Sequence, residues 1–313
     1  MTTLSKVHIG VDVSKNSLDI YLHPIGQYFK IDNTETAIKN FLIELSKYDV
    51  LSVACESTGG YEKILQKILA SFSYTLWIID PRRIKGFIIA SGCKSKTDKI
   101  DARKIAEFAS NNKPEYDIFK KTENLIELQA LINRKKDLTV FLVSEKTRLQ
   151  HPVYESSKNS IKKVLKFLEK EIKAIDQEIA IIINNDETLK TKSTLLESIP
   201  GIGKATAALL ITFVPELGKV SNAQASALVG VCPYNRESGK FKGKRYIRGG
   251  RMIPRNALYM CALTTIKYSP SIKIFYDRLI AQHKPFKVAM VAVMHKLIII
   301  ANTILKKGEL CRV

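Results

Sequence analysis

The sequence predicts an α/β domain at its start, a helical coiled-coil spacer in its middle and a mainly α-helical domain at its end, with boundaries at residues 1–115, 116–190 and 191–313. Three patterns predict this organisation. Short β-type runs alternate with helical segments at the start, Leu and Ile recur at coiled-coil spacing in the middle, and basic residues dominate the end. At 313 residues and 45% hydrophobic content, the chain is long enough to bury several cores.

The N-terminal region alternates between predicted strands and helices. Apolar and β-branched residues predict strands at 7–13, 17–22, 27–31, 51–55 and 74–79, the first three of them antiparallel. Capping residues and apolar spacing predict helices at 34–48 and 61–72, a helical region opened by Asp80-Pro81, and a helix from Thr97 to about Ser110. The order βββαβαβα is characteristic of an RNase H-like fold.

Four acidic residues stand at informative places in this order. Asp12 lies inside the first strand between apolar neighbours, where an ionised carboxylate is costly unless a cation compensates it. Glu56 ends the fourth strand, which neighbours the first strand in such a sheet. Asp98 and Asp101 are three residues apart and lie on one face of the last helix. We therefore expect the four carboxylates to converge.

Converging carboxylates disfavour one another's ionisation, so such a site requires counter-charge. Mg²⁺ supplies it, because this ion prefers oxygen ligands and bridges carboxylates to phosphate oxygens, and a pair of such ions stabilises the attacking and leaving oxygens of phosphoryl transfer. In the structural alternative, Glu56 caps the following turn, and Asp98 and Asp101 lie on a solvated helix face with Lys96, Lys99 and Arg103. The strand order favours the metal site.

The middle region carries two apolar seams. The longer seam alternates steps of four and three residues at Ile161, Leu165, Leu168, Ile172, Ile175, Ile179 and Ile182, and the weaker one holds Leu128, Leu131, Leu138, Leu142 and Leu149. Two antiparallel helices within one chain account for both seams, and so does association between chains. We expect a mixture, in which the homo-oligomer is at least a dimer and becomes a dimer of dimers when its substrate is bound.

Basic residues are concentrated in the last third of the chain. Residues 194–313 hold 19 Lys or Arg against 5 Asp or Glu, whereas residues 1–150 hold 23 against 18, within a net charge of +20. Such a field suits nucleic acid, because each neutralised phosphate releases counterions, and an anionic membrane surface is the competing partner. The apolar stretch 288–305 is interrupted by His295 and Lys296, which favours a buried helix over a membrane span.

The cysteines and the N-terminus point to the cytoplasm. Five cysteines stand far apart with no CxxC pair and no nearby His, which indicates neither a zinc site nor a disulfide framework. The polar N-terminus leads directly into a strand, so we expect no signal peptide.

Residues 195–211, LLESIPGIGKATAALLI, place a Pro-Gly-Ile-Gly turn between two apolar helical segments, the pattern of a helix-hairpin-helix. Gly201 and Gly203 let the backbone approach a phosphate, and Lys204 and the N–H groups that open the next helix bind it without reading bases. The alternative is an ordinary packing corner between two helices, with no ligand.

Residues 232–255, CPYNRESGKFKGKRYIRGGRMIPR, combine basic residues with Phe241 and Tyr246, so this segment can follow a phosphate backbone and stack on bases. The alternative is a solvated basic loop. Ser238 lies within the segment, and its hydroxyl becomes a nucleophile only if a base or a metal activates it. The predicted nucleic-acid contacts are Arg236, Lys240, Lys242, Lys244, Arg245, Arg248 and Arg251.

Five segments in this order resemble the DEDD transposases of the insertion-sequence one-ten family, which includes the Piv-type DNA invertases. They are IGVDVSK, ACESTGGY, SKTDKIDARKIAEFA, IPGIGKATA and ESGKFKGKRYIRGGR. The likeness covers nearly the whole chain, and the ordered combination is far more specific than any single motif. The resemblance places the family's acidic tetrad at Asp12, Glu56, Asp98 and Asp101, and its nucleophilic serine at Ser238.

The resemblance implies a first domain similar to the Holliday-junction resolvase RuvC and a serine-bearing transposase domain, combined into one active site. In that arrangement Ser238 attacks a DNA phosphate, and Mg²⁺ on the tetrad polarises it. The resemblance also implies a structured bridge RNA that guides the enzyme by pairing with target and donor DNA. Two rivals stay open: a structure-specific nuclease that resolves junctions with water as nucleophile, and a catalytically silent DNA-binding protein.

Overall fold

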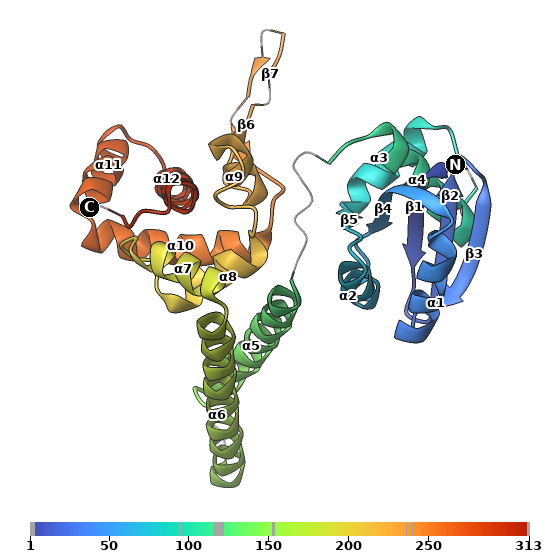
Figure 1. Ribbon diagram of the computed structural model, residues 1–313. Coiled ribbons are helices and arrows are strands. Elements are labelled where there is room, and N and C mark those ends of the chain that lie inside the picture. Colours follow the sequence, from blue (N-terminus) through green and yellow to red (C-terminus); the bar gives the residue numbers. More distant parts are fainter. Residues whose placement is uncertain are drawn as a thin grey trace. The chain divides into compact units, whose positions relative to one another are not determined.

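The computed structural model describes residues 4–93, 95–114, 122–151, 154–235, 237–239, 241–243 and 245–311, without the side chains of Phe241 and Lys242. The chain divides into two compact units, Met1–Glu123 and Asn124–Val313 (Figure 1). The two predicted coiled-coil helices belong to the second unit. The finer division of the chain at residues 115 and 190 stays a prediction.

The first unit is built on a five-stranded mixed sheet. Its strands are β1 (Ser5–Val13), β2 (Ser17–His23), β3 (Gln27–Asp32), β4 (Tyr48–Glu56) and β5 (Leu76–Ile79). They lie in the order β3-β2-β1-β4-β5, and β2 pairs antiparallel with β1 and β3, whereas β4 pairs parallel with β1 and β5. The predicted antiparallel opening and the pairing of the first and fourth strands are confirmed.

Four helices complete this unit: α1 (Glu35–Leu45), α2 (Lys63–Ser71), α3 (Pro81–Ala90) and α4 (Asp98–Asn111). The side chains of Thr34, Asp80 and Thr97 cap α1, α3 and α4 by accepting a hydrogen bond from a backbone N–H of the first turn, as predicted. The helix predicted at 34–48 was too long, because Tyr48 and the residues after it pair with the start of β1.

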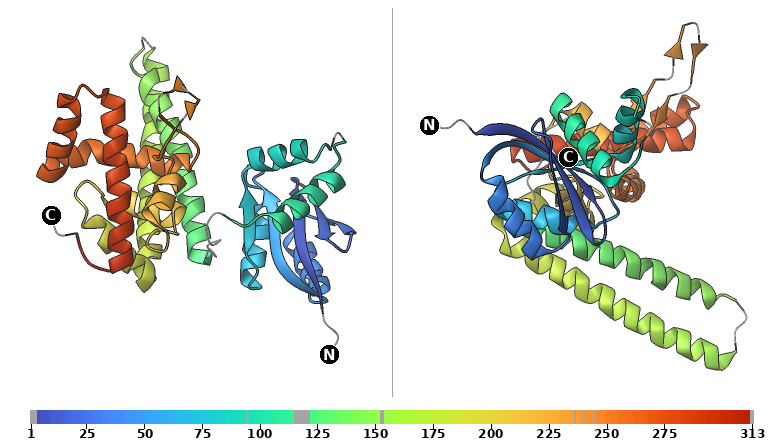
Figure 2. Two further views of the ribbon diagram at one scale, coloured as in Figure 1. Left: turned by 90° about the horizontal axis from the view of Figure 1, so that it is seen from above. Right: turned by 90° about the vertical axis from the view of Figure 1, so that its right-hand side faces the viewer.

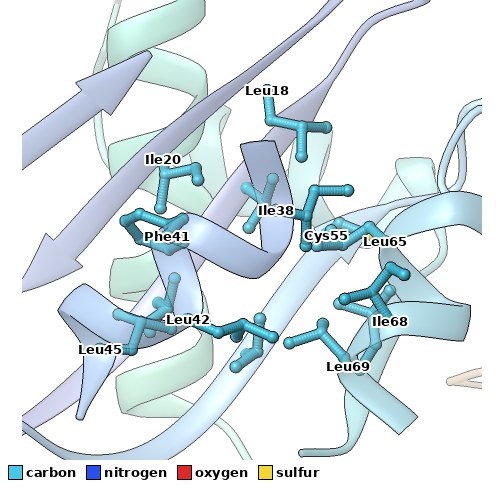
Figure 3. Packing of buried hydrophobic residues seen from close by; sticks show 14 of the residues in the cluster. Leu18, Ile20, Ile38, Phe41, Leu42, Leu45, Cys55, Leu65, Ile68 and Leu69 are labelled. Carbon is cyan, nitrogen blue, oxygen red and sulfur yellow. The ribbon is translucent and has the colours of Figure 1, made fainter. Parts of the chain in front are cut away.

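Two hydrophobic cores lie on opposite faces of the sheet. One core lies between the sheet and the helices α1 and α2, and Figure 3 shows its side chains meeting from β2, α1, β4 and α2. The other core includes Trp77, Ile84 and Phe108 and lies on the α3–α4 side. The odd-numbered residues of β1 from Val7 to Val13 belong to the first core. Because side chains alternate along a strand, the even-numbered residues face α4.

Gly10, one of these even-numbered residues, allows α4 to lie directly on β1. A Cβ atom at Gly10 would stand 2.2 Å from the carbonyl oxygen of Ala102 and 2.3 Å from the backbone nitrogen of Ala106, both in α4. Backbone atoms cannot move aside as a flexible side chain can. The glycine therefore sets the distance between the helix and the strand.

Replacing Gly10 with Ala is expected to push α4 away from β1 and to destabilise the first unit by about 2 kcal/mol, the usual cost of overpacking a well-filled interior. Thermal unfolding measures the effect. Gly86→Ala is the matched control, because Gly86 lies in α3 and a Cβ there meets nothing within 4 Å. If Gly10→Ala unfolds at the same temperature as the wild type or above it, the close approach of α4 does not depend on Gly10.

The second unit begins with two long antiparallel helices, α5 (Glu123–Arg148) and α6 (Glu155–Asn185). Figure 2 shows them side by side, and ion pairs join Lys135 to Asp176 and Lys146 to Glu169, so that α5 and α6 run in opposite directions. Leu168, Ile175 and Ile179 of the predicted seam are buried, and the other seam residues of α6 are half-buried. The structure thus shows the intrachain alternative, and association between chains stays a prediction.

The remainder of this unit is mainly helical. Its helices are α7 (Glu187–Glu197), α8 (Lys204–Phe213), α9 (Asn222–Leu228), α10 (Met252–Tyr268), α11 (Pro270–Ala281) and α12 (Phe286–Lys307). Between α9 and α10 lie the short strands β6 (Pro233–Tyr234), β7 (Glu237–Ser238), β8 (Phe241–Lys242) and β9 (Tyr246–Ile247), in which β6 pairs with β9 and β7 with β8. These strands form a narrow ribbon that projects from the helices (Figure 1).

Helix α12 covers the apolar stretch noted in the sequence. In the described part of the chain it is the one helix whose length and composition suit a membrane span, and half of its apolar window is buried. It contacts α7, α9, α10 and α11, and residues such as Met290, Val293 and Leu297 are fully buried there. This packing agrees with the predicted buried helix.

Candidate active site

The carboxylates of Asp12 and Glu56 stand at the ends of neighbouring strands. β1 and β4 pair in parallel with Val11 beside Cys55, so the next position on each strand holds Asp12 and Glu56. Val11 and Cys55 both contribute to the core on the α1–α2 side. Since side chains alternate between the two faces of a sheet, Asp12 and Glu56 face the side on which α4 lies.

Helix α4 carries the other two predicted carboxylates to the same side. Thr97 caps the helix, and Asp98 and Asp101 both lie in its first turn. The helix contacts β1, β2 and β4. The structure brings the four predicted residues near enough for their charges to interact. We call Asp12, Glu56, Asp98 and Asp101 the acidic cluster.

The charges of the acidic cluster oppose one another. Burial raises the pKa of Asp12 to about 6, and the charges of Asp101 and Asp98 are the next largest causes, followed by neighbouring carboxylates that include Glu56. Burial and the charge of Asp101 also raise the pKa of Glu56, against an opposing effect of Lys96. Burial raises the pKa of Asp101, with Lys96 again opposing and Asp98 adding to the effect. The arrangement therefore favours a cation.

A fifth carboxylate, Asp19, extends the acidic cluster along the sheet. Asp19 on β2 is the register partner of Asp12 and is only 2% exposed. The hydroxyl of Tyr28 donates a hydrogen bond to Asp19, and the ammonium of Lys30 stands 3.4 Å from its other carboxylate oxygen. This hydrogen bond is the main cause that raises the pKa of Tyr28 to about 12, with burial second.

Asp19 and Gly10 are absent from the site residues predicted from the sequence, although each carried a signal. Asp19 interrupts the apolar run SLDIYL as Asp12 interrupts VDV. A glycine inside a strand, such as Gly10, often marks close approach of another backbone segment. Only the packing of α4 on β1 in the structure shows which segment approaches Gly10.

The acidic cluster fits a hard divalent cation by its chemistry. Its donors are carboxylate oxygens, the ligands that Mg²⁺ prefers. Within the described residues, there is no group of three or more His, Cys, Asp or Glu side chains whose arrangement could hold a metal ion. A divalent cation offsets the repulsion between neighbouring carboxylates.

The raised pKa of Asp12 predicts a pH-dependent stability for the metal-free protein. Asp12 titrates near its ordinary pKa of about 4 in the unfolded chain and near 6 in the folded chain. The folded state therefore holds this proton more tightly, and the resulting stabilisation is complete below about pH 4 and is lost as the pH rises through 6. With EDTA present, Asp12→Asn is expected to raise Tm at pH 7.5 by roughly 5 °C.

The measurement compares Tm of the wild type and of Asp12→Asn at several pH values between 4 and 8. The difference is needed because burial lowers the pKa of His8, which acts in the opposite direction in the same range. The gain in Tm of Asp12→Asn is expected to shrink toward zero near pH 4. A gain that stays constant across this range contradicts the raised pKa of Asp12.

Ser238 lies on the projecting ribbon of the second unit. It is exposed on β7 and pairs with Phe241 across a turn in which Gly239 has a φ of +55°. The base of the ribbon is held by Arg251, whose guanidinium donates to both carboxylate oxygens of Glu216 at 2.6 and 2.7 Å. The ribbon thus presents an accessible serine hydroxyl from an anchored base.

The Pro-Gly-Ile-Gly turn joins α7 to α8. Gly201 has a φ of +90°, and a Cβ there would stand 2.2 Å from the hydroxyl oxygen of Thr265 in α10, so helix packing by itself requires this glycine. Gly203 and Lys204 are exposed, and Gly203 precedes the first turn of α8 with open space at its Cβ position. An anion can reach the backbone N–H groups there.

The predicted nucleic-acid contacts on the ribbon differ in what surrounds them. Arg245 and Arg248 are exposed, and the Arg248 guanidinium stands 5.4 Å from the centre of the Tyr234 ring. Arg251 is held by Glu216, which gives it a structural role, and its contact with nucleic acid stays a prediction. Arg236, Lys240, Lys244 and the side chain of Lys242 lie outside the described residues.

Comparison with known proteins finds family models that match parts of both units. Residues 9–155 match the family model for DEDD transposases of the IS110 type, and residues 193–277 match the model described as "Transposase IS116/IS110/IS902 family". The chain is 26% identical to the pilin gene-inverting proteins of Moraxella lacunata and Moraxella bovis, over 98% of this chain and of each relative. It is 27% identical to the insertion element IS110 uncharacterized 43.6 kDa protein of Streptomyces coelicolor, over 37% of this chain and 29% of that protein.

An acidic cluster beside a mixed β-sheet, joined in one chain to a basic helical unit, agrees with an enzyme that acts on nucleic-acid phosphates. The chain belongs to the IS110 family of transposases, and it is a DNA transposase or recombinase. The expected family and enzyme class are thereby confirmed. The family's general use of a divalent metal agrees with the oxygen donors of the acidic cluster.

Proposed function

We propose that this enzyme cuts and rejoins DNA strands through a serine nucleophile, Ser238, with Mg²⁺ held by the acidic cluster. The observation that carries the proposal is that the four carboxylates lie near enough for their charges to interact, so that burial and neighbouring carboxylates raise the pKa values of Asp12, Glu56 and Asp101. Such a cluster is unfavourable by itself and becomes favourable when it holds a divalent cation. The RuvC-like character of the first unit and the helix-hairpin-helix character of the turn at 198–203 are part of this proposal.

Two parts of the chain divide the reaction between them. Asp12, Glu56, Asp98 and Asp101 would hold Mg²⁺, which when bound neutralises charge on the phosphate. The hydroxyl of Ser238 attacks phosphorus, its proton passes to a base or water, and a deoxyribose hydroxyl leaves. The strand stays attached through a phosphoserine bond. A deoxyribose hydroxyl of the new partner strand then attacks this bond and releases Ser238, so no phosphodiester energy is lost to water.

The positive charge of the second unit supports DNA and a guide RNA as the partners. DNA is the partner that family membership gives, and residues 194–313 hold 19 basic against 5 acidic residues. The backbone N–H groups at Gly203 and Lys204 are suited to phosphates, and the exposed Arg245 and Arg248 on the ribbon are available for contacts with nucleic acid. For the source of sequence specificity we propose a structured guide RNA, the bridge RNA of the resemblance.

The relatives named for inverting a pilin gene support a reaction at two DNA sites. Two sites require two or more active sites held together, and we propose a homodimer that pairs on DNA. Its supporting feature is the α5–α6 hairpin, which exposes Val140, Phe141, Val143 and Phe167. These exposed apolar side chains are available for association between chains.

The test of this function uses protein co-expressed with the flanking DNA of its own gene. RNA that copurifies is sequenced, and DNA matching its loops is assayed for strand exchange with Mg²⁺ and with EDTA. We expect strand exchange in Mg²⁺ and none in EDTA. Cleavage without rejoining supports a hydrolytic junction nuclease instead, and binding without cleavage in Mg²⁺ supports a catalytically silent DNA-binding protein.

A further inference from the structure

A buried carboxylate beside the acidic cluster has no role in the proposed reaction. Asp19 lies directly across from Asp12 in the antiparallel pairing of β1 and β2, and it is 2% exposed. Burying a carboxylate is costly unless ion pairs and hydrogen bonds compensate it, and an apolar residue of similar size fills the same space without that cost. A purely structural role explains Asp19 poorly.

The partners of Asp19 come from one strand and contact the helix that carries half of the acidic cluster. Tyr28 and Lys30 on β3 are two residues apart, so they share a face of the sheet. The Lys30 ammonium stands 3.4 Å from a carboxylate oxygen of Asp19 and 3.9 Å from one of Asp98. The ammonium of Lys99 stands 5.1 Å from the centre of the Tyr28 ring. Both partners of Asp19 therefore touch the first turn of α4.

These contacts link the sheet to the metal ligands. We propose that Asp19 is a positioning residue: it fixes Tyr28 and Lys30, which hold the first turn of α4 and so place Asp98 and Asp101 opposite Asp12 for metal binding. Its negative charge beside Asp12 also strengthens the attraction for a cation. This inference rests on the proposed metal-binding function of the acidic cluster. Groups that orient metal ligands from behind typically change metal affinity by about 10- to 100-fold when they are removed.

The test measures binding of Mn²⁺, which accepts the same oxygen ligands as Mg²⁺, to the full-length protein without DNA. The decrease in the free Mn²⁺ electron paramagnetic resonance signal gives Kd. We expect Asp19→Asn to weaken binding about tenfold, with Tm within a few degrees of the wild type. Tyr28→Phe keeps the ring under Lys99 but removes the hydrogen bond to Asp19, and we expect it to weaken binding several-fold.

Tyr21→Phe is the matched control. Tyr21 is the register partner of Tyr28 on β2, and its hydroxyl lies near Gly26 rather than at Asp19. We expect this variant to bind Mn²⁺ as the wild type does. A second readout is the Mg²⁺ concentration that gives half-maximal DNA cleavage, which should rise for Asp19→Asn and Tyr28→Phe but not for Tyr21→Phe.

The outcomes separate this inference from the proposed function. If the wild type binds Mn²⁺ and both Asp19→Asn and Tyr28→Phe bind it equally well, the positioning role is wrong and the metal site stands. If the wild type binds no Mn²⁺, the metal site fails and the positioning role fails with it. If Asp19→Asn does not fold, Tyr28→Phe decides the question, because this substitution removes only the hydroxyl group and leaves the ring in place.

Discussion

Replacing Asp101 with Asn is expected to reduce DNA cleavage by roughly a thousandfold while the protein stays folded. Loss of one preorganised group that stabilises developing charge costs about this much in other enzymes. Asn keeps the shape of the side chain and removes only its charge, so metal binding is lost while packing is kept. Burial and the charge of Asp98 raise the pKa of Asp101, so the variant should be at least as stable as the wild type without metal.

The measurement is the initial rate of strand cleavage in Mg²⁺, together with Tm in EDTA. Asp49→Asn is a matched control, because Asp49 is exposed near the start of β4, the opposite end of that strand from Glu56. It removes the same charge from the same unit of the protein and should leave cleavage unchanged. Full activity of Asp101→Asn excludes this carboxylate from the active site.

Replacing Ser238 with Ala is expected to abolish strand exchange, by roughly 10⁴-fold or more, while DNA binding persists. Loss of an enzyme nucleophile typically has an effect of this size. Binding should persist because it depends on phosphate contacts made by the basic residues of the second unit, which the substitution leaves in place. The exposed position of Ser238 on β7 also means that removing its hydroxyl leaves no cavity.

Strand exchange and DNA binding are measured on the same protein preparations, by a recombination assay and by a gel-shift titration. Ser157→Ala is the control, since Ser157 is an exposed serine in the first turns of α6. It should match the wild type in both assays. If Ser238→Ala still exchanges strands at the wild-type rate, the covalent mechanism is wrong.

The local parts of this structure could be predicted because each rests on a signal from a few neighbouring residues. Thr97 followed by an amphipathic segment indicated where α4 begins, and the cap is present. The valines on either side of Asp12 indicated a strand, and Asp12 lies within β1. Glu56 was predicted to end the fourth strand, and the expected pairing of that strand with β1 was enough to place Glu56 beside Asp12.

The parts that could not be predicted depend on contacts between distant segments. Nothing near Gly10 in the sequence shows that the backbone of Ala102 lies against it. Likewise, the ion pair between Arg251 and Glu216 is invisible in a segment that reads as uniformly basic, and Gly201 fits a phosphate-binding turn and a close contact with Thr265 equally well. In each case tertiary packing decides between two roles that the local sequence allows.

The central claim, that Ser238 forms a covalent bond to DNA with the help of the acidic cluster, can be tested on a single denaturing gel. Labelled DNA is incubated with the wild type, Ser238→Ala or Asp101→Asn in Mg²⁺, and the protein-linked band is digested and mapped by mass spectrometry. The covalent mechanism predicts a heat- and detergent-resistant band for the wild type alone, with the nucleotide on the peptide that contains Ser238. Cleaved DNA with no protein attached, or an adduct on another residue, would contradict it.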